Sequence, residues 1–142
     1  MVGIMPSPEL VAAIKTIVAN AREGNLDAAY GGYRALFSGA TFASFDSHEK
    51  RQALRLMIHA KGVPDPPTPA MVEAHRAAVE PLAQFVKLEG EPADYEMLGM
   101  CYVATGDEKA AGEVFRAALT IERERNAQSD LCGALMKRVS ML

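Results

Sequence analysis

Apolar residues recur at three- and four-residue steps along most of this 142-residue chain, in runs separated by glycines, prolines and capping residues. This period places apolar side chains on one face of an α-helix. It predicts seven helices within the ranges 7–24, 25–38, 46–62, 68–90, 92–106, 107–126 and 129–141. Ala, Leu, Met and Glu are plentiful, which favours helix over sheet. The sequence therefore predicts an all-α fold.

Residues at the helix ends support these boundaries. Ser7 is followed by Pro8, a good helix start, and Asp46 with Glu49 three residues later forms a capping box. Residues 38–45 are expected to form a loop. A second loop is expected before Pro69, where four prolines lie within seven residues, and Pro81 should kink the following helix.

The most informative motif is a set of large and small residues at helical spacing. It comprises Tyr95, Leu98, Gly99, Tyr102, Ala111 and Phe115. Large side chains form the interface of a helical hairpin, and the small Gly99 leaves room for the second helix. The pattern resembles the tetratricopeptide repeat, whose unit of about 34 residues runs aromatic-x2-Leu-Gly-x2-Tyr and then Ala-x3-Phe. The resemblance implies helical hairpins stacked into a right-handed superhelix.

A weaker echo of this unit occurs earlier in the chain. Ala29, Tyr33 and Leu36 follow Gly24 at the same distances at which Ala111, Phe115 and Ala118 follow Gly106. We therefore expect a single domain over residues 1–142, built from hairpins at about 7–38, 46–90 and 92–126. The middle hairpin is inferred more from its place between the other two than from residues that match the repeat pattern. A capping helix over 129–141 completes the stack, as repeat arrays commonly require.

Charge and composition argue against several kinds of partner. The chain has 15 basic and 18 acidic side chains, a net charge of -3, and no basic run with interleaved aromatics, so nucleic acid is not expected. No segment is long and apolar enough for a membrane span, and residues 1–6 lack a secretory pattern. Cys101 and Cys132 are too far apart for a zinc motif and do not form a disulfide framework. A cytoplasmic location is expected.

No residue set indicates an enzyme, a metal site or a cofactor site. His48, His59 and His75 have no ligand-like spacing, and we expect them on the surface or in a groove. Gly31 and Gly32 lie inside a helical pattern, where close helix packing explains them better than a phosphate loop.

The resemblance implies a concave surface lined by the first helix of each hairpin. The positions of this chain that match the concave surface of the repeat are Val11, Ile14, Val18, Arg22, Gln52, Leu56, His59, Glu96, Met100 and Val103, with Glu49 and Ala93 at equivalent places. Family members that clamp a carboxylate use Lys and Asn where this chain has Ile14 and Val18. An amphipathic helix or an apolar strand segment would fit such a lining better. An alternative assigns part of this stripe to the core.

Two functions remain open at this stage. The favoured one is a protein-binding module, an adaptor or small holding chaperone that presents an apolar groove to a partner protein. The alternative is a structural or regulatory subunit whose apolar faces serve permanent homo-oligomerisation. The first helix is apolar nearly all round, so it should be covered by a partner helix or by a second copy in a homodimer.

Overall fold

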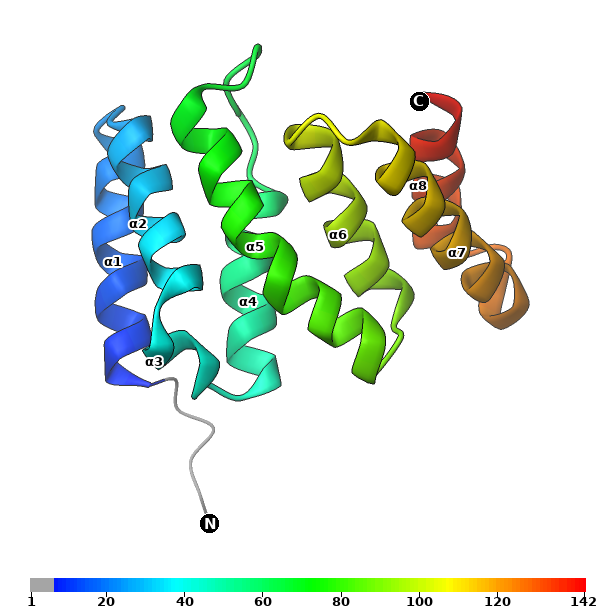
Figure 1. Ribbon diagram of the computed structural model, residues 1–142, viewed down its shortest axis with the longest axis horizontal. Coiled ribbons are helices and arrows are strands. Elements are labelled where there is room, and N and C mark those ends of the chain that lie inside the picture. Colours follow the sequence, from blue (N-terminus) through cyan, green and yellow to red (C-terminus); the bar gives the residue numbers. More distant parts are fainter. Residues whose placement is uncertain (1–6) are drawn as a thin grey trace. The chain divides into compact units, whose positions relative to one another are not determined.

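The structure, a computed structural model, describes residues 7–142, and every regular element in that range is an α-helix (Figure 1). The helices are α1 (Pro8–Arg22), α2 (Leu26–Ser38), α3 (Ala40–Ala43), α4 (Ser47–Ile58), α5 (Pro69–Leu88), α6 (Pro92–Ala104), α7 (Glu108–Asn126) and α8 (Asp130–Ser140). The all-α prediction is confirmed. The expectation that residues 1–6 hold no secretory signal falls outside the described range.

The chain divides into two compact units, Met1–Ala77 and Ala78–Leu142, and the boundary falls inside α5. The predicted middle hairpin, residues 46–90, therefore contributes to both units. The single domain expected over residues 1–142 stays a prediction. Across residues 7–142, no helix combines the length and apolar character needed to cross a bilayer.

In the first unit, α1 and α2 form an antiparallel hairpin held by a close approach (Figure 1). A Cβ placed on Gly32 would lie 2.6 Å from Cγ1 of Ile17, whereas one on Gly31 would meet nothing within 4 Å. Gly32 is thus the point at which α2 contacts the buried face of α1. The packing interpretation of this glycine pair is confirmed at Gly32.

The segment expected to be a loop, residues 38–45, contains the short helix α3. Its buried Phe42 continues a chain of ring contacts, with centroids 5.3 Å from Phe37 and 5.9 Å from Phe45. Tyr33 stacks on Phe37 at 5.7 Å. The loop prediction was wrong because three phenylalanines within nine residues bury enough apolar surface to order this connection.

The N-terminal ends of α1 and α4 are joined by a hydrogen bond. Asp46 caps α4, its Oδ1 accepting the Glu49 backbone N–H at 2.8 Å, which is the Asp46 half of the predicted capping box. The Glu49 carboxylate in turn accepts the Ser7 backbone N–H at 2.6 Å. Asp46 therefore caps α4, while the side chain of Glu49, in the first turn of α4, connects this turn to the residue that precedes α1.

The N-terminal half of α5 closes the first unit with a buried histidine. His75 is 4% exposed, its ring packs beside Tyr30 with centroids 6.2 Å apart, and its Nδ1 lies 2.8 Å from the Met71 carbonyl. The expectation of a surface or groove histidine was wrong here, because His75 shares a helix face with the buried Met71 and Ala78. Pro81 lies within α5, which remains helical on both sides of it.

The second unit is built on the α6–α7 hairpin, with α8 packed against α7 (Figure 1). A Cβ on Gly99 of α6 would fall within the space occupied by the Phe115 ring of α7, which confirms the small-residue prediction. On another side of that ring lies the Arg138 guanidinium, 6.0 Å from its centroid. Arg138 Nε also donates to the Glu96 carboxylate at 2.7 Å, so this side chain connects α8 to α6.

Side-chain caps define the other ends of this unit. Asp107 accepts the Ala110 backbone N–H at 3.1 Å at the start of α7, and Ser129 accepts the Cys132 N–H at 3.0 Å before α8. Phe115, Cys132 and Leu135 belong to one buried cluster. The predicted capping helix is therefore packed into the core that the hairpin begins.

We expect Gly99→Ala to lower the free energy of unfolding by about 1–3 kcal/mol, because the added methyl group overlaps a buried aromatic ring. Gly133→Ala in α8 is the matched control. A Cβ there meets nothing within 4 Å, and the higher helix propensity of alanine should stabilise the protein by about 0.5–1 kcal/mol. Urea unfolding followed by circular dichroism measures both. Equal effects would contradict the close approach at Gly99.

Burial lowers the pKa of His75 below its ordinary value, although the hydrogen bond to the Met71 carbonyl acts in the opposite direction. The unfolded chain then binds a proton more readily than the folded one, so stability falls as the pH falls below about 6.5. We expect His75→Asn to flatten the decline in melting temperature between about pH 7.5 and about pH 5. The exposed His48, changed to Asn, should leave that decline as in the parent protein.

Candidate partner-binding groove

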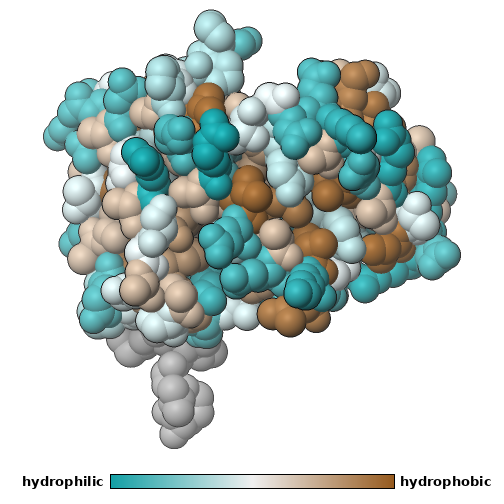
Figure 2. Space-filling view, in the orientation of Figure 1, coloured by the Kyte–Doolittle hydropathy of each residue, from teal (hydrophilic) through white to brown (hydrophobic). Residues whose placement is uncertain are grey.

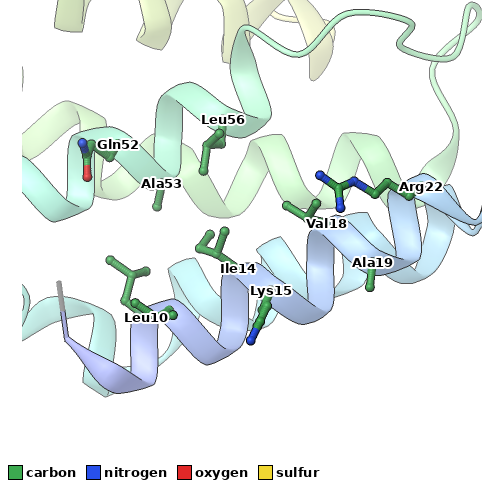
Figure 3. A pocket seen from close by; sticks show the side chains of 10 residues that line it. Leu10, Ile14, Lys15, Val18, Ala19, Arg22, Gln52, Ala53 and Leu56 are labelled. Carbon is green, nitrogen blue, oxygen red and sulfur yellow. The ribbon is translucent and has the colours of Figure 1, made fainter.

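In the first unit, α1 and α4 run in the same direction and border a groove of about 530 Å³ (Figure 3). Its lining is mainly aliphatic and consists of Leu10, Val11, Ile14, Lys15, Val18, Ala19, Arg22, Gln52, Ala53 and Leu56. Figure 3 shows Ile14 and Val18 of α1 turned toward Leu56 of α4. The floor of the groove is therefore formed by aliphatic side chains from two helices.

Six of the ten residues predicted to form a partner surface come together here. They are Val11, Ile14, Val18 and Arg22 from α1, and Gln52 and Leu56 from α4. Two of these apolar side chains are widely open to solvent, with Val11 44% and Leu56 48% exposed. They lie on a solvent-facing groove and not in a closed core.

Leu10, Lys15, Ala19 and Ala53 also line the groove and were not predicted. The available signal was the near-continuous apolar character of residues 10–19, which indicates that more than one face of this helix is in contact or lies open. The repeat register selected only one residue per turn. It therefore missed the neighbours that widen the groove.

A second hollow of about 330 Å³ continues the groove at the C-terminal end of α1. It shares Val18, Arg22 and Leu56 with the first and adds Tyr30 and Lys61 among its lining residues. The two hollows therefore adjoin each other along these shared residues. Burial raises the pKa of the Tyr30 phenol, so the ring is neutral at physiological pH.

The described charged side chains that line the two hollows all have the same sign. Among residues 7–142, Lys15, Arg22 and Lys61 are the only charged residues lining either hollow. In Figure 3, Lys15 points away from α4, whereas the Arg22 side chain extends along the groove toward Val18. Arg22 therefore places its positive charge where the two hollows meet.

The other four predicted residues do not line this groove. His59 is exposed at the C-terminal cap of α4, while Glu96, Met100 and Val103 belong to α6 in the second unit. Glu96 is 5% exposed and accepts the hydrogen bond from Arg138, and Met100 packs against the core cluster of that unit. Val103 is 46% exposed. On α6 the positions chosen from the repeat pattern therefore include two residues that pack within the unit, Glu96 and Met100, and one exposed residue, Val103.

Two features outside the groove bear on possible chemistry. Within residues 7–142, no three His, Cys, Asp or Glu side chains gather as a metal site would require. Burial raises the pKa of the Cys101 thiol to about 12, so it stays protonated and is a poor nucleophile. The groove contains no general base or nucleophile paired with one.

The face of the α1–α2 hairpin seen in Figure 2 is only weakly polar. Figure 2 shows pale to tan side chains over α1 and α2, with hydrophilic ones gathered toward the helix ends. Only Leu10 and Ile17 of α1 are buried. The expectation that a partner helix or a second copy covers this apolar helix stays a prediction.

Comparison of the chain with protein-family models, with curated proteins and with solved structures yields no match.

Proposed function

We propose that this protein is a cytoplasmic protein-binding module, an adaptor or small holding chaperone, that takes an apolar helical segment of a partner protein without turnover. The observation that carries the proposal is the solvent-open aliphatic groove between α1 and α4. A globular protein gains stability by burying such side chains. Leaving Val11 and Leu56 about half exposed is consistent with a partner that covers them.

The spacing of the groove residues favours a helix as the occupant. Val11, Ile14 and Val18 follow one another at three- and four-residue steps, the pattern of a seam between packed helices. Leu56 of α4 faces this seam, so a third helix could place its own apolar stripe between the two. From Leu10 to Arg22 the groove is about 18 Å long, which matches about three helical turns.

The tetratricopeptide-like architecture is part of the same proposal. It would be built from helical hairpins that stack into a right-handed superhelix. The close approaches at Gly32 and Gly99 support hairpins of this kind. The free thiols of Cys101 and Cys132 suit a reducing compartment.

Selection from a library of displayed peptides tests the proposal. We expect enrichment of sequences with apolar residues at i, i+3, i+4 and i+7, since these form one helical stripe. Leu56→Glu should weaken binding of an enriched peptide by about tenfold or more, because a charge would be buried against its apolar face. Fluorescence anisotropy with the labelled peptide measures the affinity.

Met136→Glu is the control for this substitution. Met136 is 49% exposed on α8, almost the same as Leu56, but it lies outside the groove. Its variant should bind with the parent affinity. Failure to enrich any helical pattern, or equal losses in both variants, would refute the groove as the binding site.

A second candidate is a subunit whose exposed α1 face serves permanent homo-oligomerisation. It is favoured by the exposed Val11 on α1 and by the weakly polar face of the α1–α2 hairpin in Figure 2, because terminal hairpins of repeat arrays normally present a polar outer face.

Light scattering coupled to size-exclusion chromatography tests this second candidate. A homodimer formed through α1 should dissociate in Val11→Glu, since burying a carboxylate in an aliphatic interface is unfavourable. Met136→Glu serves again as the control and should leave the dimer intact. A parent protein that elutes as a monomer at about 10 µM, far above the dissociation constant of a permanent dimer, would eliminate this candidate.

A further inference from the structure

We propose that the partner segment is an amphipathic helix with acidic side chains at the end that sits beside Arg22 and Lys61. This inference rests on the proposed function and adds the sign of the partner's charge and the end of the partner helix that carries it. It predicts which charged helix the groove accepts and which it rejects.

The sign of the charge comes from the lining residues. Of the described residues that line the two adjoining hollows, only Lys15, Arg22 and Lys61 are charged, and none is acidic. An occupant that buries the aliphatic floor brings its own flanking residues close to these cations. Acidic residues there gain attraction, whereas basic ones meet like charge in a partly desolvated site.

The position of the charge comes from the two ends of the groove. At the N-terminal end of α1 and α4, the Glu49 carboxylate is hydrogen-bonded to Ser7, and the nearby groove residue Gln52 is neutral. At the C-terminal end, Arg22 lies in the last turn of α1, and Lys61 follows α4. The groove is therefore neutral at one end and positive at the other.

The ends of the helices make these two cations necessary. The C-terminus of an α-helix carries partial negative charge, so α1 and α4 alone would disfavour a carboxylate at this end. Arg22 and Lys61 reverse the local sign with formal charges. Removing them should therefore invert the preference of the groove and not merely weaken it.

The test uses synthetic helical peptides of about 18 residues with one leucine stripe, which is long enough to span the groove. There are four peptides. One carries a glutamate pair at its N-terminal end and one at its C-terminal end, and the other two carry a lysine pair at the corresponding ends. We expect one glutamate peptide to bind about tenfold more tightly than its lysine counterpart, as two exposed attractions replace two repulsions. Rising salt should narrow the difference.

The charge-reversed variant Arg22→Glu with Lys61→Glu should prefer the lysine peptide. A variant with Lys109→Glu and Lys137→Glu has the same net charge, changes two exposed lysines of the second unit, and should retain the parent preference. Circular dichroism melting checks that both variants fold. Isothermal titration calorimetry gives the affinities.

The outcomes separate this inference from the proposed function. Equal affinity for glutamate and lysine peptides, with binding lost in Leu56→Glu, would overturn the acidic partner while retaining a helix-binding groove. No binding of any peptide would overturn both. A parent dimer that no peptide dissociates would assign the groove to a second copy of the chain. If both charge-reversed variants came to prefer the lysine peptide, the preference would follow the net charge of the protein, and the role of Arg22 and Lys61 would be refuted.

Discussion

The structure depends on close packing of helix pairs at single glycines. Gly32 lets Ile17 of α1 lie directly against α2, and Gly99 lets Phe115 of α7 lie directly against α6. A residue with a side chain at either point would separate the helices by the width of a methyl group or more. Because protein interiors are close-packed, such a separation would leave gaps along the whole interface.

The contact at Gly32 also decides which face of α1 is left open. Successive residues of a helix are rotated by about 100°, so Ile14 and Val18 both lie on the same side of Ile17. Once Ile17 is buried against α2, these side chains face α4 across the groove. The Glu49–Ser7 hydrogen bond sets the N-terminal ends of α1 and α4 at the same level. The groove thus follows from hairpin packing and from one hydrogen bond between the first turn of α4 and the residue before α1.

Polar groups have different roles in the two units. In the second, Glu96 and Arg138 connect α6 to α8 beside the Phe115 ring, and burial of Glu96 removes it from the surface. In the first, Arg22 and Lys61 border two adjoining hollows, and none of the described residues that line them is acidic. The same residue types therefore stabilise one core and give the other unit a charged surface. In general, burial of an aliphatic surface supplies affinity for a partner, and charged residues beside it supply specificity for the partner's charge.

Local sequence determined the helices, because capping residues, glycines and apolar periodicity act within a few residues of one another. Asp46, Asp107 and Ser129 begin helices where their side chains can accept a backbone N–H. The same information placed six groove residues on two helices. It did not determine that α3 would form, that His75 would be buried or that Glu96 would pair with Arg138. Those outcomes depend on residues distant in the chain, whose contacts exist only after the helices have packed.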